Sequence, residues 1–319
     1  PDLSKYNRAI FIGCGSAMHA GMVGKYLMER YDRVISSVEL ASEFRYRNLV
    51  MAEDSLGIVI SQSGETADTL AALKLAKERG SRTLAIVNVV GSTIAREADN
   101  VLYTLAGPEI SVATTKAYSA QLVTGYCLAV QMGKVKGKIT EEEYAGYIAE
   151  LKSLPEKIEK SMSDMGRIQW FASKYANARD VFFVGRGMDY AISLEGSLKL
   201  KEISYLHAEA YAAGEMKHGP IALIDDGFPV TAIATNSPTY EKTVSNLQEC
   251  RARGANIVVV ASEGDTNIKK HADHVIYIPP VRDCFSAITA SVPLQLFARA
   301  IALLRDCDVD QPRNLAKSV

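Results

Sequence analysis

The chain has 319 residues, of which 48% are hydrophobic and 23% are charged, and its formal net charge is −1. This length allows about two domains, and the composition is that of an ordinary globular protein. The chain lacks the basic excess that nucleic-acid binding requires, and no apolar run approaches the roughly 18–20 residues that span a bilayer, so neither a nucleic acid nor a membrane is an expected partner.

Apolar, β-rich runs alternate with helical patterns along the whole chain, which predicts an α/β fold with mainly parallel sheets flanked by helices. The strands are predicted at residues 8–13, 56–61, 82–88, 180–185, 228–234 and 255–261. After the second of these strands, apolar residues recur every three positions up to Gly80, as in an amphipathic helix with a glycine stop. Residues 133–166 are rich in charge and predicted to be helical, with Thr140 and Glu143 spaced as a capping box.

Two stretches of the chain repeat. The sequence "FIGCGS" at 11–16 is similar to "FVGRGM" at 183–188, and residues 80–104 are similar to residues 254–278. Two copies of one βαβ-rich unit are the simplest account of these matches.

The stretch "SQSGET" at 61–66 lies where a predicted strand turns into a predicted helix. A helix N-terminus offers unpaired N–H groups and a partial positive charge, which favour phosphate, and the hydroxyls of Ser61, Ser63 and Thr66 add donors. The loop has no Lys or Arg, so a small monophosphate suits it better than a triphosphate. The alternative is that these hydroxyls only cap the helix. In the second copy, "TNSPT" at 235–239 has a proline in place of the glycine.

Other residue patterns argue against bound groups. The stretches "GCGSAM" (13–18) and "GRGMDY" (185–190) begin like a dinucleotide fingerprint, but Met18 and Tyr190 stand at the third glycine position, so NAD is not expected. The five cysteines are scattered and form no C-x-x-C pair, which indicates free thiols in a reducing cytoplasm rather than a zinc site. We therefore predict no cofactor and no metal.

Five longer stretches together resemble a known family. They are "ASEFRYR" (41–47), "ISQSGETADTL" (60–70), "SVATTKAYSAQL" (111–122), "LEGSLKLKEISYLHAEAYAAGEMKHGP" (194–220) and "DVDQPRNLAKSV" (308–319). They are similar to the isomerase part of the glutamine–fructose-6-phosphate aminotransferase (glucosamine-6-phosphate synthase) family, which is built from two sugar-isomerase (SIS) domains. The resemblance covers essentially the whole chain.

The resemblance implies a fold and its boundaries. Each SIS domain would be a flavodoxin-like sandwich of a parallel sheet and helices. We expect the first domain at 1–135, a linker helix with the second domain at 136–304, and a tail that closes the active site at 305–319.

The resemblance also implies a site for the sugar phosphate. The residues that match the family's binding positions are Cys14, Gly15, Ser16, Ser61, Gln62, Ser63, Thr66, Val112, Ala113 and Thr114. Two positions differ from the family pattern. Ala17 lacks a hydroxyl that the family directs at the phosphate, and Thr114 stands where many members have serine.

Four residues match the family's catalytic positions: Lys199 and Glu202 as an acid–base pair, His218 as the ring-opening group, and Lys317 as the Schiff-base lysine. The residue types fit the reaction, because ketose-to-aldose conversion needs ring opening, proton transfer between C1 and C2, and stabilisation of charge. From spacing alone, Lys199 and Glu202 also fit a solvated ion pair, His218 a turn residue, and Lys317 a frayed tail.

The activity that the resemblance implies is the conversion of fructose 6-phosphate, with ammonia from glutamine, to glucosamine 6-phosphate. Glucose 6-phosphate is a further expected ligand, and a cytoplasmic homodimer with a shared active site is the expected assembly, with His218 supplied across its interface. The chain begins at Pro1 without the nucleophilic N-terminal cysteine of the family's glutaminase domain, so we expect the isomerase part alone. The alternatives are a sugar-phosphate-binding regulator and a related phosphosugar deglycase or isomerase.

Overall fold

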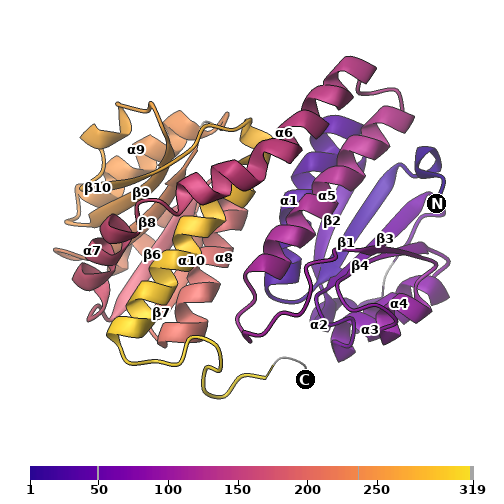
Figure 1. The fold of residues 1–319 in the computed structure, drawn as a ribbon, viewed down its shortest axis with the longest axis horizontal. Helices are drawn as coiled ribbons and strands as arrows, with labels where there is room; N and C mark the ends of the chain where they lie inside the picture. The colour runs from indigo at the N-terminus through magenta and orange to yellow at the C-terminus, as the bar shows by residue number, and fades with distance from the viewer. Residues whose placement is uncertain (49, 236, 317–319) are drawn as a thin grey trace. The chain divides into compact units, whose positions relative to one another are not determined.

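The computed structural model describes residues 1–48, 50–235 and 237–316, and the chain divides into two compact units (Figure 1). Unit 1 contains Pro1–Leu151 and unit 2 contains Lys152–Asn314. Helix α6 (Glu141–Ser161) runs from one unit into the other. The predicted capping box at its start is confirmed, because Thr140 N donates to Glu143 Oε2 at 2.8 Å and Glu143 N donates to Thr140 Oγ1 at 3.2 Å.

Unit 1 is built around a five-stranded parallel sheet in the order β2-β1-β3-β4-β5. Its strands are β1 (Arg8–Gly13), β2 (Ile35–Leu40), β3 (Ser55–Ser61), β4 (Arg82–Val87) and β5 (Asn100–Tyr103). Its helices are α1 (Ser16–Leu27), which continues as a π-helical turn (Met28–Asp32), α2 (Ala41–Phe44), α3 (Ala67–Glu78), α4 (Thr93–Glu97) and α5 (Lys116–Val135). Helices α1 and α5 pack on one face, against Phe11, and α2, α3 and α4 cover the other, against Ile12.

Unit 2 repeats this plan around a second parallel sheet, in the order β10-β9-β8-β6-β7. Its strands are β6 (Asp180–Gly185), β7 (His207–Ala212), β8 (Pro229–Ala234), β9 (Asn256–Ser262) and β10 (His274–Ile278). Its helices are α7 (Met165–Tyr175), α8 (Met188–Ser204), α9 (Tyr240–Arg251) and α10 (Ser286–Leu304), with 3-10 turns at Ala213–His218 and Pro220–Leu223. Helices α8 and α10 pack together on one face, and α9 covers the other.

The order of both sheets is the flavodoxin order 2-1-3-4-5 when each unit's strands are numbered from its own start. The predicted fold class is therefore confirmed. The two units also share turn geometry. Gly15 before α1 has φ 55° and ψ −128°, and Gly187 before α8 has φ 57° and ψ −124°. The helical segments that follow both end at a left-handed residue, Arg33 with φ 55° and Tyr205 with φ 59°.

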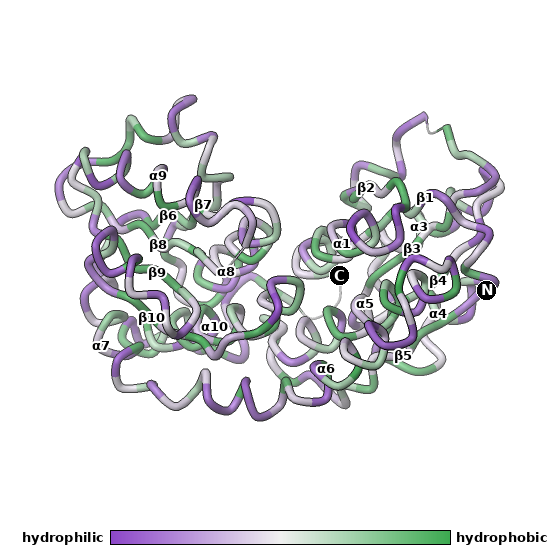
Figure 2. The backbone as a smooth tube through the Cα atoms, turned by 90° about the horizontal axis from the view of Figure 1, so that it is seen from above, coloured by the Kyte–Doolittle hydropathy of each residue, from purple (hydrophilic) through white to green (hydrophobic). Residues whose placement is uncertain are grey.

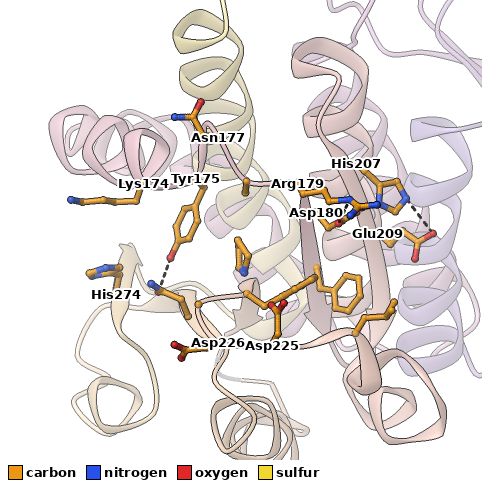
Figure 3. Close-up of a pocket in the computed structure, with 17 residues that line it drawn as sticks. Lys174, Tyr175, Asn177, Arg179, Asp180, His207, Glu209, Asp225, Asp226 and His274 are labelled. Atoms are coloured by element: carbon orange, nitrogen blue, oxygen red, sulfur yellow. Dashed lines mark hydrogen bonds and ion pairs between the residues drawn. The ribbon is translucent and has the colours of Figure 1, made fainter.

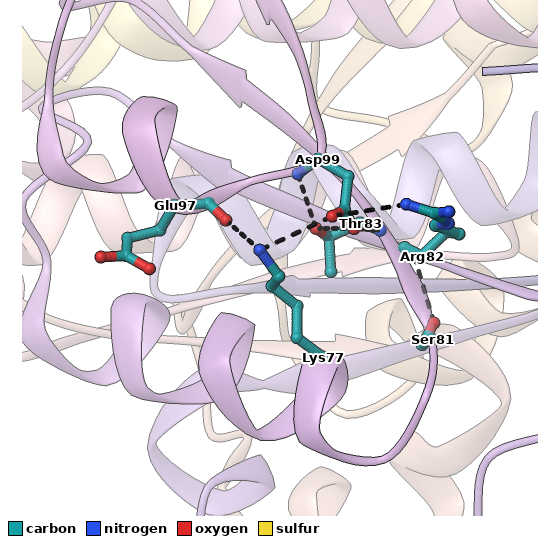
Figure 4. Close-up of polar contacts among 6 residues, drawn as sticks. All are labelled: Lys77, Ser81, Arg82, Thr83, Glu97 and Asp99. Carbon is teal, nitrogen blue, oxygen red and sulfur yellow. Dashed lines mark hydrogen bonds and ion pairs between the residues drawn. The ribbon is translucent and has the colours of Figure 1, made fainter.

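A repeated polar contact holds the last strand of each sheet, and Figure 4 shows the contact of unit 1. In unit 1, Asp99 Oδ2 accepts from Thr83 N at 2.9 Å and from Thr83 Oγ1 at 2.8 Å, and Lys77 Nζ lies 3.6 Å from Asp99 Oδ1. Burial alone would raise the pKa of Asp99, but these bonds and the nearby cations hold the pKa below its usual value. In unit 2, Asp273 Oδ2 accepts from Ile257 N at 2.8 Å, and Arg251 Nη2 lies 3.2 Å from Asp273 Oδ1.

The hydropathy of the chain follows this architecture (Figure 2). The six predicted strands are the inner strands of the two sheets, and each agrees with an observed strand to within one residue at either end.

The expectation that no apolar run is long enough to span a bilayer needs correction. The segment Asp283–Leu304 is long and apolar enough to cross a membrane by composition, with a mean hydropathy of 1.6. Since 67% of the apolar 18-residue window in that segment is buried in the fold, α10 fits a core helix of unit 2, packed on α7 and α8.

Candidate active site

The "SQSGET" loop lies at the carboxyl end of β3, beside the carboxyl end of β1, which is the edge where open α/β sheets bind ligands. Ser61 is buried, its Oγ accepts from Gly64 N at 3.0 Å, and it lies 3.2 Å from Thr66 Oγ1. Ser63 Oγ accepts from Glu65 N at 3.2 Å. Thr66 is the N-cap residue of α3, but its side chain makes no capping bond. The helix-capping alternative therefore does not account for the Thr66 hydroxyl.

Gly64 has no room for a side chain. Its φ is +67°, and a Cβ atom built on it would lie 2.0 Å from Ser92 Oγ. The adjacent Glu65 fastens the loop to α4, because its Oε1 accepts from Thr93 N at 2.7 Å, and this bond holds the pKa of Glu65 below its usual value. The loop is thus held in shape by contacts within unit 1.

A pocket of about 610 Å³ opens beside this loop, lined by Gln62, Ser63, Asn88, Val89, Val90, Leu105, Gly107, Pro108 and Glu109. Glu109 Oε2 accepts from Thr114 Oγ1 at 3.2 Å and from Ala117 N at 3.0 Å, so it anchors the predicted sugar-lining segment and caps α5. In that segment Val112 is half-buried and Ala113 is buried. No local pattern in the sequence points to Glu109, since its partners lie five and eight residues further along the chain.

The turn between β1 and α1 contacts the first turn of α3. Thr69 Oγ1 donates to the half-buried Cys14 Sγ at 4.0 Å. Gly15 is the N-cap residue of α1, and the half-buried Ser16 is its first residue. The structure therefore brings the turn with Cys14, Gly15 and Ser16 to the same edge of unit 1 as Ser61.

Unit 2 contains a buried charge cluster on α8. Lys199 is only 2% exposed; its Nζ donates to Glu202 Oε2 at 2.6 Å and lies 3.5 Å from Oε1 of the buried Glu195. Burial acts to lower the pKa of Lys199, but the charges of Glu195 and Glu202 outweigh it and leave the pKa raised. Glu202 itself is half-buried, whereas Lys201 is exposed. The predicted acid–base pair is therefore not a solvated ion pair.

The other two predicted catalytic residues are His218 and Lys317. His218 is exposed at the end of the 3-10 turn after β7, and within the described part of the chain it makes no hydrogen bond to Lys199 or Glu202. Lys317 lies outside the described residues. Both assignments stay predictions.

A larger pocket, of about 940 Å³, lies at the opposite edge of the unit 2 sheet, where β6 to β10 begin (Figure 3). Its polar side chains are largely paired with one another: His207 Nδ1 lies 2.6 Å from Asp180 Oδ1, and Tyr175 Oη donates to Asn256 Oδ1 at 2.7 Å. Doubly wound folds bind ligands at the carboxyl edge of the sheet, so we keep the "SQSGET" loop of unit 1 as the candidate binding residues and the charge cluster on α8 of unit 2 as candidate catalytic residues.

Comparison with known proteins shows the family of the chain. The SIS domain family model matches residues 2–131 and 174–305. The chain belongs to the SIS domain family. It is 52% identical over 318 residues to a glutamine–fructose-6-phosphate aminotransferase [isomerizing] of Clostridium tetani and 50% identical to one of Thermus thermophilus. The chain spans about half the length of these relatives, 52% and 53%.

Solved structures of the family have the same fold. The C-terminal domain of glucosamine-fructose-6-phosphate aminotransferase from Francisella tularensis is 38% identical, with a TM-score of 0.93 over 97% of this chain and 87% of that one. A glucosamine-6-phosphate deaminase from Thermotoga maritima is 26% identical, with a TM-score of 0.81 over 99% of this chain and 91% of that one. The SIS chain described here is thus similar to the C-terminal part of the aminotransferases.

Proposed function

We propose that the chain is the sugar-isomerase part of a glutamine–fructose-6-phosphate aminotransferase and catalyses the steps that lead from fructose 6-phosphate to glucosamine 6-phosphate. The observation that carries the proposal is the buried Lys199, 2.6 Å from Glu202, on the first long helix of unit 2. A buried ammonium costs stability unless a carboxylate pairs with it. Buried, strongly interacting charges of this kind are concentrated at functional sites.

The sugar phosphate would be bound by the ten residues predicted from the sequence, of which Ser61, Ser63 and Thr66 supply hydroxyls. Gly64, between them in the loop, would allow the close approach of the backbone. The loop has no cation, so the free amides of the α3 N-terminus and these hydroxyls would carry the recognition of the phosphate dianion. Glucose 6-phosphate and glucosamine 6-phosphate would bind through the same phosphate contacts.

The isomerisation would then proceed by proton transfer. Glu202 moves the proton between C1 and C2, and Lys199 stabilises the negative charge that develops on the sugar oxygens. His218 exchanges the ring proton when the sugar opens, and Lys317 holds C2 as an imine, which makes the adjacent proton more acidic. No metal or cofactor takes part in these steps.

The assembly that fits this function is a cytoplasmic homodimer in which the partner's copy of His218 completes the site, with a glutaminase domain in the full-length protein as the source of ammonia. The exposed position of His218 agrees with a role at an interface. We also propose that the first domain ends at residue 135, that the linker helix and second domain extend from 136 to 304, and that the tail begins at 305. A deglycase or deaminase is the second candidate, because the Thermotoga maritima glucosamine-6-phosphate deaminase shares the fold at 26% identity.

The test is the incorporation of deuterium from solvent at C1 of fructose 6-phosphate and at C2 of the aldose that forms from it, followed by NMR in deuterated water. Glu202→Gln keeps the size of the side chain but removes its carboxylate, so exchange should fall by at least about a hundredfold while the sugar phosphate still binds. Glu215→Gln, at an exposed position in the same unit, is the matched control and should exchange normally. Normal exchange in Glu202→Gln would contradict the role of Glu202, and binding without any exchange in the unaltered chain would favour the regulator.

A second experiment tests the tail. Borohydride should trap fructose 6-phosphate on Lys317 as a secondary amine, which peptide mapping by mass spectrometry would locate. A label spread evenly over surface lysines would contradict the imine.

Mixed dimers of His218→Ala and Glu202→Gln chains should recover part of the activity if His218 serves the neighbouring subunit's site.

A further inference from the structure

The loop of unit 2 that corresponds to the phosphate loop is already occupied, by the carboxyl group of a side chain of the protein. Asp189, the second residue of α8, is completely buried. Its Oδ1 accepts from Thr235 Oγ1 at 2.7 Å, and its Oδ2 accepts from Thr235 N at 3.2 Å and from Ser237 Oγ at 3.4 Å. Three donors therefore converge on one carboxylate at the carboxyl end of β8.

These donors occupy the positions of the phosphate loop in unit 1. The alignment that pairs residues 80–104 with 254–278 also pairs Ser61 with Thr235 and Ser63 with Ser237. The strands agree with it, because Ser55 at the start of β3 then pairs with Pro229 at the start of β8. The loop of unit 2 thus keeps two of the hydroxyls, although Pro238 stands where unit 1 has Gly64.

The carboxylate comes from the position that is empty of polar groups in unit 1. The alignment of "FIGCGS" with "FVGRGM" pairs Ala17 with Asp189, and the near-identical dihedral angles of Gly15 and Gly187 put the two residues at the same place in their turns. Where unit 1 has a methyl group, unit 2 has the carboxylate that fills its own loop.

The bonding of Asp189 is that of a bound anion and not of a helix cap. A capping carboxylate accepts from the amides of its own helix, whereas the donors to Asp189 come from a loop 46 and 48 residues further along the chain. Burial raises the pKa of Asp189 to about 7, against the bonds from Thr235 and Ser237, which lower it. Burying a carboxylate is costly unless it is hydrogen-bonded, so the three donors explain how the fold tolerates it.

We infer that Asp189 stands in for a phosphate group in unit 2, and that removing its carboxylate turns this loop into a binding site for inorganic phosphate. The inference goes beyond the proposed function, which concerns the loop of unit 1. It explains why the two repeated units would bind one sugar phosphate rather than two.

The experiment counts phosphate sites. Asp189→Ala gives unit 2 the residue that unit 1 has at this position, and equilibrium dialysis with labelled inorganic phosphate should find one more bound phosphate per chain than in the unaltered protein. Adding Thr235→Val, which removes a hydroxyl donor, should abolish the additional site. Adding Ser61→Ala and Thr66→Ala instead should leave it in place.

The experiment measures the difference in bound phosphate between the Asp189→Ala chain and the unaltered chain. Its result therefore does not depend on the proposed function. If the unaltered chain binds no phosphate, the proposal for unit 1 fails, but the gain of one site in Asp189→Ala still supports the inference. An Asp189→Ala chain that folds but gains no phosphate site overturns it.

Loss of the buried carboxylate could also prevent folding. In that case the thermal unfolding of Asp189→Ala is followed with and without phosphate, beside Asp189→Asn, which keeps the shape and fills the loop. A chain that folds only when phosphate is supplied supports the inference. Asp189→Ala and Asp189→Asn chains that respond to phosphate equally overturn it.

Discussion

The two units share a fold, yet equivalent buried positions on α1 and α8 carry apolar side chains in unit 1 and charged side chains in unit 2. On α1 of unit 1, Val23 and Leu27 are buried apolar residues, each 1% exposed. The same positions on α8 of unit 2 are Glu195 and Lys199, which are buried equally deeply but charged. The fold therefore depends on a buried helix face at these positions, and the chemistry depends on which side chains occupy it.

The "SQSGET" loop of unit 1 and the corresponding loop of unit 2 also differ. Among the described residues, no carboxylate accepts from the hydroxyls of Ser61, Ser63 or Thr66 in unit 1, whereas Asp189 accepts from the corresponding loop of unit 2. Each unit thus keeps one half of the predicted site, the phosphate loop in unit 1 and the acid–base pair in unit 2. A repeated fold can divide a function between its copies by changing a few side chains at the ends of strands and on one helix.

The largest expected effect comes from the helix positions that differ. Lys199→Ala should lower the free energy of unfolding of unit 2 by about 3–5 kcal/mol, because it leaves buried carboxylates without their cation. The fluorescence of Trp170, the only tryptophan of the chain and a residue of α7, reports the unfolding of unit 2 in urea. Lys201→Ala, an exposed change on the same helix, should cost less than about 0.5 kcal/mol.

The matched change in unit 1 sharpens the comparison. Leu27→Ala should cost about 2–5 kcal/mol through lost packing, and this cost should not depend on pH. The Lys199→Ala cost should shrink at low pH, because protonated carboxyl groups need no cation. Equal pH profiles for the two variants would contradict the assignment of Lys199 as the partner of charged carboxylates.

The second prediction tests the loops by ligand. Hexose 6-phosphates at a hundredfold excess over their dissociation constant should stabilise the chain by about 2.7 kcal/mol, and unphosphorylated hexoses should not. Ser61→Ala combined with Thr66→Ala should remove most of the rise in the thermal midpoint. Ser237→Ala, which removes a hydroxyl from the corresponding loop of unit 2, should leave it intact, and equal stabilisation by fructose would exclude a phosphate site.

Gly64 offers a smaller effect on stability. Gly64→Ala combines a left-handed backbone with a clash against Ser92, whereas Gly91→Ala has a similar φ of +72° and no atom within 4 Å of the added Cβ. The clash should make Gly64→Ala about 1–3 kcal/mol more costly than Gly91→Ala. Hydrogen exchange of unit 1 amides would measure both costs. Equal costs would mean that the loop has room at Gly64.

The last prediction concerns the pH dependence of stability at Asp32, whose counterpart in unit 2 is Ser204. Asp32 is completely buried, neither of its oxygens has a hydrogen-bond partner among the described residues, and burial raises its pKa to about 8. Lys136 lowers that pKa by its charge, but its ammonium donates to Tyr6 O at 2.8 Å. Ser204, by contrast, donates to Leu200 O at 2.6 Å.

Between an unfolded pKa of about 3.9 and the folded value, only the folded state keeps the proton on Asp32. Stability should therefore fall as the pH rises through this window, by about 1.4 kcal/mol per pH unit. Asp32→Ser, which copies unit 2, and Asp32→Asn, which keeps the shape, should both lessen this slope in urea unfolding measured from pH 5 to pH 7.5. An unchanged slope would mean that Asp32 is ionised in the fold.

The fold could be predicted from the sequence except at the sheet edges. The six predicted strands are inner strands, which read as apolar runs because both faces are covered. The four strands that were not predicted, β2, β5, β7 and β10, are the edge strands. β2 and β5 contain mostly exposed or half-buried residues, so their sequences "ISSVEL" and "NVLY" carry a weaker pattern.

The site could be predicted where its residues are adjacent in sequence, as in the hydroxyls of the "SQSGET" loop and the spacing of Lys199 and Glu202. Residues that act over longer separations could not be predicted. Glu109 holds Thr114 from outside the helix that it caps, and Asp189 reaches a loop 46 residues away. Their roles depend on how the strands are ordered in the sheets, which no local pattern records.

The contact that holds the last strand of each sheet separates what the two copies share from what differs between them. Lys77, Thr83 and Asp99 of unit 1 stand in the same register as Arg251, Ile257 and Asp273 of unit 2. Both copies have the carboxylate and its cation at this contact, whereas the proposed binding and catalytic positions differ. A chain designed from the shared positions alone would therefore keep the contact at its edge strand and neither candidate site.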